Sequence, residues 1–550
     1  MSGSSLSRLA REAAPGSLRR APARRSAPLA RSCALLLSAA ACAPALPPPG
    51  PAGRSESPGQ ALARPTAPAP RFEFREVARF EAWRNASADA PAAAEIVAAN
   101  EDGTLLAYTD PRSRRIGFVD LRDPRAPLPL GAVEVAGEPT SVAIRGARAL
   151  AVVDAGRDPE APAGALLVID LATRRIERTI DLGGQPDSIA VAPDGRFAAI
   201  AIENQRDEKR PGPPMPQLPG GFLVIVDLVG EPSAWRLRRV ELAGIAELWP
   251  QDPEPEFVAI SARGIAAVTL QENNHIVLVD LAQGTVVGAF SAGFVDLEGV
   301  EVDEAGLERR GAPRRIGARR AAPREPDGIA WVGAEALVTA NEGDLDGGTR
   351  GFTLFDLEGR VLHDSGDELE RLALRRRVYP FARAERRGVE PEGVAFAEFS
   401  LPWGAEPLLF VAAERGNFVS VHRLPAAPQV EAAEGASRAG PARGAPLARP
   451  EFLQLIPVGP APEGLLPIPS RGLLVVASEL DDAAAGVRSA IAILELTVIP
   501  EEPGERGAGG ADERAVPPRA QEASAPGTLP DAPATPTGAE GGRGRQGGAR

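Results

Sequence analysis

Cysteine and lysine are almost absent from the 550-residue chain. Cys33 and Cys42 are the only cysteines, and both lie near the N-terminus, so the body of the chain has no disulfides. A core of this size is stable without them. Lys209 is the only lysine, and aromatic residues make up only 4% of the chain. Hydrophobic residues make up 44%, so the core must consist mostly of Val, Ile, Leu and Ala, which suit buried strands.

Histidine is also scarce, and this limits the enzyme classes open to the chain. His275, His363 and His422 all fall in segments with the pattern of β-strands, which argues against a Ser-His-Asp triad. There is no Gly-x-Ser-x-Gly elbow, no P-loop and no Gly-x-Gly-x-x-Gly between a strand and a helix, so no organic cofactor is indicated. A net charge of −13 argues against nucleic-acid binding, and we interpret the basic run Arg309–Arg324 as a solvated loop.

The N-terminus has the pattern of an export signal. Several arginines precede an apolar run from Cys33 to Ala41, which is too short to span a bilayer and ends in small residues. We therefore expect a signal peptide over residues 1–41. Cys42 follows three alanines, as in a bacterial lipobox, and is the predicted site of lipidation. The alternative is an ordinary signal peptide cut near Ala41 or Ala43. The protein is expected in the periplasm, outer membrane or cell surface of a bacterium, touching a membrane only through the lipid.

Composition divides the rest of the chain. Residues 42–70 are rich in Pro and Ala and are expected to form a linker, whereas residues 500–550 lack apolar periodicity and are expected to be a disordered tail. Residues 71–499 carry a strand pattern and form the predicted folded domain. We interpret residues 425–448, rich in Ala, Pro and Gly, as a loop insertion within that domain.

A unit of four short strands recurs about seven times along the predicted domain. Its third strand is the clearest, as in 116–121, 166–171, 223–228, 276–281 and 352–357, with weaker copies at 418–424 and 491–496. Four antiparallel strands per repeat predict an all-β fold, a β-propeller of seven blades. The repeats leave six and eight blades open, and a β-sandwich does not repeat one internal motif.

Two further segments have predicted roles in this fold. A propeller often closes its ring by letting one terminus supply the outer strand of the last blade. Residues 72–81 alternate apolar and polar side chains, and we expect them to pair with Ile491–Thr497. Residues 367–377 have helical spacing and predict a short helix inserted between blades.

Two acidic motifs also recur. A proline with acidic neighbours precedes strand one, and an acidic residue, often with Asn, follows strand two. The first motif stands at 185–187, 254–256, 325–328, 390–393 and 461–464, and the second at 203–204, 272–274, 341–344, 414–417 and Glu479. Consecutive strands alternate direction, so both loops emerge on one face, and strand one lines the central channel. The two motifs are therefore expected to gather near the axis.

Converging carboxylates repel one another, so they bind cations, raise pKa values or pair with arginines. Oxygen ligands without His or Cys favour Ca²⁺ or Mg²⁺. The candidate metal ligands are Glu203, Glu272, Asn274, Asp327, Glu342, Asp344, Glu390, Glu414, Glu463 and Glu479. The alternative is structural, because such residues also fix turns by hydrogen bonds to backbone N–H groups, and Pro-Asp-Gly or Pro-Glu-Gly is ordinary turn chemistry.

Two arginines stand at matching places before third strands. Arg350 and Arg488 are candidate catalytic residues that would grip a phosphate, with Glu392 as the third candidate. A divalent ion held by Glu272, Glu342, Asp344 and Glu392 would activate water and screen the phosphate charge. Neutralisation of the acidic ring is the alternative role of both arginines.

Several ordered motifs resemble a known family. Segments 268–274, 324–330, 339–344, 350–355 and 390–394 resemble those of bacterial exported propellers of the choice-of-anchor I type, which overlap with proteins labelled "esterase-like activity of phytase". The resemblance covers roughly residues 90–497. It implies a propeller displayed outside the cell by varied anchors, of which a lipid on Cys42 would be one. The leading hypothesis is a monomeric, metal-dependent, phytase-like hydrolase of small phosphoesters. The competing hypothesis is a non-catalytic binding or scaffolding protein with a partner in the cell envelope.

Overall fold

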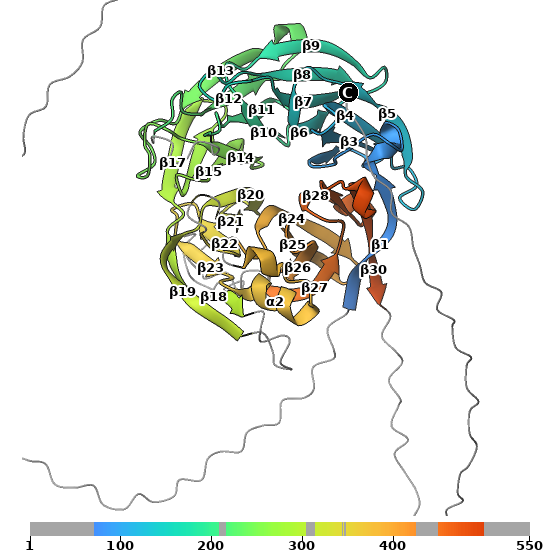
Figure 1. Ribbon diagram of the computed structural model, residues 1–550. Coiled ribbons are helices and arrows are strands. Elements are labelled where there is room, and N and C mark those ends of the chain that lie inside the picture. The colour runs from blue at the N-terminus through green and yellow to red at the C-terminus, as the bar shows by residue number, and fades with distance from the viewer. Residues whose placement is uncertain are drawn as a thin grey trace, which may run out of the picture. The chain divides into compact units, whose positions relative to one another are not determined.

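The computed structural model describes residues 71–207, 216–303, 314–343, 345, 348–384, 386–424 and 449–499. Within these ranges, seven four-stranded antiparallel sheets surround a common axis (Figure 1). The chain is therefore a seven-bladed β-propeller, as the repeats predict. The predicted signal peptide, Cys42, the linker, the tail from residue 500 and the insertion at 425–448 lie outside the described residues.

Blades 1 to 6 take their strands in chain order from the axis outward, and blade 7 takes its outermost strand from the N-terminus. Blade 1 contains β2 (Val97–Ala99), β3 (Leu105–Asp110), β4 (Arg115–Asp120) and β5 (Leu128–Glu134). Blade 2 contains β6 (Glu138–Arg145), β7 (Arg148–Asp154), β8 (Gly164–Asp170) and β9 (Arg175–Asp181). Blade 3 contains β10 (Pro186–Val191), β11 (Phe197–Ile202), β12 (Phe222–Asp227) and β13 (Arg236–Glu241). Blade 4 contains β14 (Pro255–Ile260), β15 (Ile265–Leu270), β16 (His275–Asp280) and β17 (Thr285–Ser291).

The later blades follow the same order. Blade 5 contains β20 (Pro326–Val332), β21 (Ala336–Asn341), β22 (Phe352–Asp356) and β23 (Val361–Asp364). Blade 6 contains β24 (Pro391–Leu401), β25 (Gly404–Ala413), β26 (Phe418–Arg423) and β27 (Glu451–Pro457). Blade 7 contains β28 (Pro462–Ile468), β29 (Leu473–Ser478), β30 (Ala490–Ile499) and β1 (Arg71–Glu81). Short 3-10 turns occur at Ala82–Asn85, Pro232–Ala234, Phe381–Arg383, Pro469–Arg471 and Ala483–Ala485.

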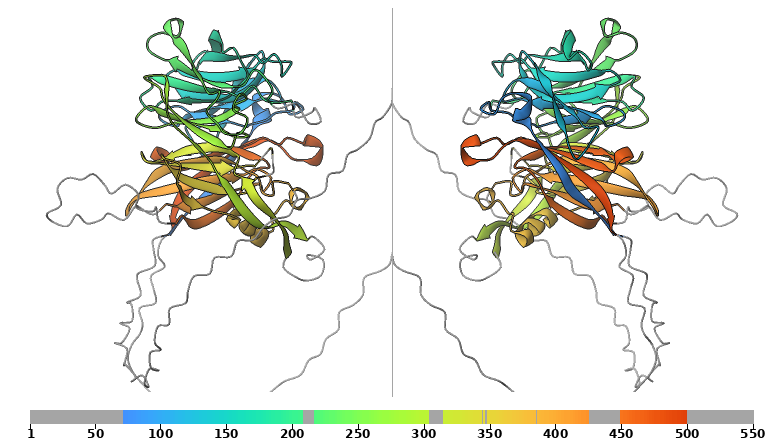
Figure 2. Two further views of the ribbon diagram at one scale, coloured as in Figure 1. Left: turned by 90° about the vertical axis from the view of Figure 1, so that its left-hand side faces the viewer. Right: turned by 90° about the vertical axis from the view of Figure 1, so that its right-hand side faces the viewer.

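The ring closes as predicted, because the N-terminal strand completes the last blade. Strand β1 runs antiparallel to β30, with Arg71 opposite Ile499 and Glu81 opposite Ala490. The two strands lie side by side in the right-hand view of Figure 2, β1 in blue and β30 in red-orange. Residues from the two ends of the folded domain therefore share one sheet.

The hydrophobic core lies between blades rather than at the axis. Seven clusters of buried aliphatic and aromatic side chains each join two neighbouring blades among the described residues. The second and third strands are buried on both faces, which explains their continuous apolar runs, such as Phe197–Ile202. Small Ala and β-branched side chains suit this double burial because adjacent sheets must approach closely.

Two insertions depart from the four-stranded plan. The predicted helix is confirmed as α2 (Glu368–Arg376), which packs Leu369 and Leu372 against blades 5 and 6. The expectation of a solvated loop at Arg309–Arg324 is wrong for its described part. Strands β18 (Phe294–Asp303) and β19 (Arg314–Pro323) pair as a separate hairpin. Arg324 is buried and forms an ion pair with Asp364 at 2.6 Å, so the end of the run is not solvated either.

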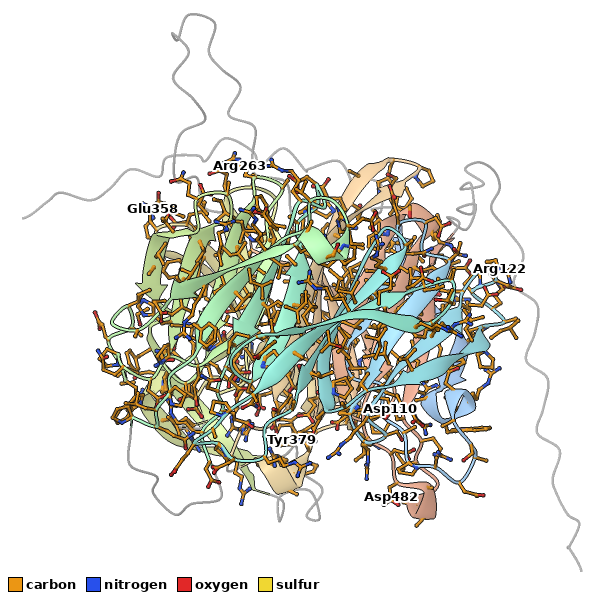
Figure 3. All side chains as sticks on the ribbon, turned by 90° about the horizontal axis from the view of Figure 1, so that it is seen from above. Asp110, Arg122, Arg263, Glu358, Tyr379 and Asp482 are labelled. Atoms are coloured by element: carbon orange, nitrogen blue, oxygen red, sulfur yellow. The ribbon has the colours of Figure 1, made fainter. Side chains whose placement is uncertain are left out.

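The two faces of the ring carry different loops. Figure 3 shows Asp110, Tyr379 and Asp482 on one side and Arg122, Arg263 and Glu358 on the other. We call the first side the acidic face. Every innermost strand begins there, and the acidic motifs stand just before these strands. Among the described residues, no helix has both the length and the apolar character needed to cross a bilayer.

Candidate metal-binding channel

Proline fixes the start of the innermost strand in five consecutive blades, 3 to 7. Strands β10, β14, β20, β24 and β28 each begin at a proline, where no ladder hydrogen bond is lost. Immediately afterwards, the pairing with the second strand shifts register, for example between Pro186 and Ile189 and between Pro462 and Leu465. Such a bulge re-aims the side chain that lies within it. In all five blades this side chain is the acidic residue after the proline.

These acidic residues form a ring around the channel. A cavity of about 110 Å³ on the axis is lined by the acidic residue after the proline in blades 3 to 7 and by the segments that begin blades 1 and 2. The inner ring consists of one lining residue from each blade, in chain order Glu95, Thr140, Asp187, Glu256, Asp327, Glu392 and Glu463. Only blade 2 places a neutral side chain, Thr140, at this position. The sequence expectation that strand one lines the channel is confirmed.

Contacts between blades hold the inner ring in place. A Cβ added to Gly328 would lie 2.4 Å from the carbonyl oxygen of Glu392 in the next blade. Gly393 has the same relation to Glu463, at 2.2 Å. In blade 3, the Ser188 hydroxyl donates to the carbonyl of Glu256 at 2.6 Å. The glycine of Pro-Asp-Gly and Pro-Glu-Gly therefore permits close approach of the next blade, whereas ordinary turn chemistry does not explain it.

Burial and mutual repulsion control the charge of the inner ring. Burial raises the pKa of Glu95, Glu256, Glu392 and Glu463 well above the usual range, and neighbouring carboxylates raise each of them further. Burial also raises the pKa of Asp187 to about 7. The ring therefore holds protons at neutral pH unless a cation replaces them.

A second ring surrounds the first, made of the acidic residues that follow strand two. Glu342 pairs with Arg387, Glu272 with Arg206, and Glu414 with Arg415, the last at 2.5 Å. Glu479 shares a hydrogen bond with Glu463 of the inner ring. An adjoining cavity of about 220 Å³ lies at the boundary between the two rings, with Glu203, Glu272, Glu342, Arg206 and Arg387 among its lining residues.

Two groups of three carboxylates have the spacing of a cation site. One contains Asp327, Glu342 and Glu392, the other contains Glu392, Glu414 and Glu463, and the oxygens within each lie within 4.8 Å of one another. Glu392 belongs to both. Its Oε2 atom is buried and has no hydrogen-bond partner among the described residues. Such an orphaned oxygen needs either a proton or a cation.

The structure gives two of the other predicted ligands structural roles. The Asn274 side chain accepts from the backbone N–H groups of Arg324 and Glu325 and donates to the carbonyl of Gly293, so it fixes a loop. Glu390 is buried and held by arginines, including Arg383 at 2.6 Å. Asp344 lies outside the described residues. Glu390 and Asn274 thus take the structural role that the sequence left open.

The two predicted phosphate-binding arginines lie outside both cavities. Arg350 is buried, faces Glu370 of α2 at 3.5 Å and donates to the carbonyl of Arg386. Arg488 pairs with Asp481 at 2.6 Å and donates to the carbonyls of Ala88 and Ala90. Both therefore neutralise carboxylates and tie down loops. The arginines that do line a cavity, Arg206 and Arg387, were not singled out from the sequence.

Three carboxylates of the inner ring were also missed. Asp187 and Glu256 stand in the quoted proline motifs but were not chosen, and Glu95 follows Ala94 instead of a proline. The sequence feature that identifies Asp187 and Glu256 is their place directly after a proline, because the residue at that place points into the channel. The residue before the proline has left-handed backbone in blades 5 to 7, with φ of 44° at Glu325 and 55° at Glu390. That residue belongs to the loop and not to the site.

Stability without metal should fall as the pH rises. The unfolded chain releases its carboxyl protons near pH 4–5, whereas burial holds the pKa of Asp187 at about 7 and that of Glu414 at about 8. Between these limits the unfolded state binds fewer protons, so the free energy of unfolding decreases with pH. We expect a lower Tm at pH 8.5 than at pH 5.5 in EDTA. Glu463→Gln should weaken this dependence, whereas Glu335→Gln at the surface should not.

A model of the choice-of-anchor I domain matches residues 95–243 and 239–347. Over these residues the β-propeller is similar to the choice-of-anchor I domain. The first match spans blades 1 to 3, and the second spans blade 4, the β18–β19 hairpin and the inner half of blade 5. The resemblance inferred from the motifs is therefore confirmed. No curated protein sequence matches the chain.

Solved structures share the propeller only in outline. Hydrazine synthase of Kuenenia stuttgartiensis has 14% identity and a TM-score of 0.43, over 75% of this chain and 97% of that one. A streptogramin B lyase has 11% identity and a TM-score of 0.42, over 78% and 98%. The periplasmic gluconolactonase of Pseudomonas aeruginosa has 14% identity and a TM-score of 0.37, over 67% and 86%. At these values the likenesses say nothing about the activity of this propeller.

Proposed function

We propose that this propeller binds a divalent cation in its axial channel. The observation that carries the proposal is Glu392, which belongs to both carboxylate groups and has a buried Oε2 atom without a hydrogen-bond partner among the described residues. Among those residues, no arginine or lysine forms an ion pair with Glu95, Asp187, Glu256, Glu392 or Glu463. Guanidinium groups neutralise the carboxylates of the second ring. A cation would do the same for the inner ring.

The flexible ligand set makes Ca²⁺ the first ion to test. Ca²⁺ binds six to eight oxygens at about 2.3–2.6 Å in flexible geometry. The carboxylate oxygens of each group lie within 4.8 Å of one another, which is compatible with binding to one such ion. Mg²⁺ requires about 2.0–2.1 Å and near-ideal octahedral geometry, so it is the comparison ion.

Calorimetric titration of the full, exported protein with CaCl₂ at pH 7.5, after treatment with EDTA, tests the proposal. We expect saturable binding and a higher Tm in Ca²⁺. Glu392→Gln keeps the shape of the side chain but removes the shared ligand, so it should weaken binding by at least about tenfold. Glu335→Gln is the matched control, because Glu335 is an exposed carboxylate outside the channel. Absence of Ca²⁺ binding to the wild type would refute the proposal.

A second candidate is metal-dependent hydrolysis of phosphoesters, and one observation favours it. Arg206 and Arg387 line the same cavity as Glu342 and Glu392, so guanidinium groups stand beside the proposed cation site. Guanidinium forks suit phosphate oxygens, and a bound divalent ion would supply an activated water and a screen for phosphate charge. EDTA-sensitive turnover of phosphomonoesters or phosphodiesters would support this candidate. Without it, cation-dependent binding of an envelope partner is the function that we propose.

We also propose that the protein is exported and anchored through a lipid on Cys42. Choice-of-anchor domains are features of exported or surface proteins, and the export pattern of residues 1–41 supports the same location. The register of β1 and β30 puts Arg71 and Ile499 at the end of blade 7 opposite the acidic face. An anchor joined there leaves the mouth of the channel uncovered.

A further inference from the structure

Arginines neutralise the second ring in two different ways. Arg206 contacts Glu272 and also reaches Asp252 at 2.8 Å and Glu254 at 2.7 Å. The side chain of Arg206 is only 4% exposed, and all three carboxylates are buried. Departure of this guanidinium would leave three buried carboxylates without their cation, which is strongly unfavourable. Arg206 is therefore a permanent counter-ion.

Arg387 has a different environment. Its side chain is 25% exposed and contacts Glu342, and it lies 3.1 Å from Glu390. Glu390 also has Arg383 at 2.6 Å and Arg415 at 3.6 Å. When Arg387 leaves, Glu390 keeps two positive partners, and the ion pair that is broken is the one with Glu342. A cation bound to Glu342 would replace that partner, so the exchange isolates no buried charge.

The backbone beside Arg387 is fixed although its side chain is accessible. Arg350 donates to the carbonyl of Arg386, and the N–H of Val389 donates to the Glu370 carboxylate at 2.9 Å. Gly388 has φ of 61°, and a Cβ there would lie 2.0 Å from an oxygen of Glu370. The segment after α2 is thus locked against the helix on both sides of Arg387. Only the side chain needs to move when its partner changes.

Resting on the proposed cation site, we propose that Arg387 is an exchangeable counter-ion that competes with the cation for Glu342. Glu342 belongs to the group with Asp327 and Glu392, and Gln271 donates to its other oxygen at 2.7 Å. A cation bound by this group takes over the Glu342 carboxylate and releases the guanidinium to the cavity that it already lines. Arg387 thereby lowers the affinity of the empty site and becomes available to an anionic ligand once the cation is bound.

Calcium affinities of the full-length protein and two variants test this role. Arg387→Gln removes the competitor, so it should bind Ca²⁺ roughly tenfold more tightly than the wild type by calorimetry. Arg383→Gln is the matched control, since Arg383 comes from the same segment and pairs with Glu390 but not with Glu342. It should change the affinity by less than about threefold. A circular-dichroism melt in EDTA establishes that both variants are folded.

The outcomes separate the two proposals. Equal tightening by both substitutions, or weaker binding to Arg387→Gln, would overturn the exchange role of Arg387 while leaving the cation site intact. Absence of Ca²⁺ binding to the wild type and to Arg387→Gln alike would overturn the cation site itself. Binding that appears only in Arg387→Gln would show competition by Arg387 but would refute a cation site that is occupied in the wild type.

Discussion

Deletion of residues 71–81 should abolish cooperative folding of the propeller. Two phenylalanines of β1, Phe74 and Phe80, are buried in the clusters that join blade 7 to its two neighbours. Phe74 packs edge-on against Phe399 and Phe410, with ring centroids 5.4 Å away in each case. Loss of one such ring costs about 3–5 kcal/mol, so loss of both approaches the whole stability of a typical domain, about 5–15 kcal/mol.

The measurement is urea unfolding of the deletion variant followed by far-UV circular dichroism. A synthetic peptide of residues 71–81 added in trans should restore a cooperative transition, because it supplies the strand that pairs with the open edge of β30. The same peptide with Phe74 and Phe80 replaced by alanine is the control and should not restore it. A deletion variant that unfolds at the wild-type midpoint would show that β1 does not close the ring.

Arg206→Ala should destabilise the protein by about 3–5 kcal/mol. The substitution leaves Asp252, Glu254 and Glu272 buried without the guanidinium that they share. The hydrogen bond from Arg206 to the carbonyl of Asp252 is lost as well. Because three carboxylates then face one gap, added Ca²⁺ should recover part of the lost stability.

Chemical denaturation with and without Ca²⁺ measures both effects. Arg263→Ala is the matched control, because Arg263 pairs with Glu335 at the surface, where the two side chains are 63% and 73% exposed. That change should cost no more than about 1 kcal/mol. Similar losses in the two variants would mean that the buried ion cluster contributes no more than a surface pair.

The fold could be predicted from the sequence because each blade repeats the same pattern of buried strands. Third strands such as Leu166–Leu171 are buried on both faces, so they appear as continuous apolar runs at regular intervals. The alternation of residues 72–81 predicts the closing strand β1 just as directly, and the helical spacing of residues 367–377 predicts the helix α2. The β18–β19 hairpin is not predicted from the sequence because its basic run lacks the apolar alternation of a buried strand.

The candidate site could be predicted from the sequence only in part. That acidic loops gather on one face follows from strand direction, but the choice of side chain depends on a one-residue bulge that periodicity does not reveal. The bulge turns Glu256 and Glu463 into the channel, while left-handed backbone at Glu325 and Glu390 keeps those side chains outside it. The arginine partners could not be foreseen, because Arg206 and Arg387 reach the rings from loops without a repeated position.

The pairing of β1 with β30 also determines when the protein can finish folding. Protein synthesis produces β1 before any blade and β30 after every other strand, so the first strand must remain unpaired until nearly the whole domain exists. During this interval the alternating apolar edge of residues 72–80 is open to wrong partners. Completion of the ring is therefore a late, long-range step, and the speed of that step decides how long an unfinished chain is exposed to aggregation.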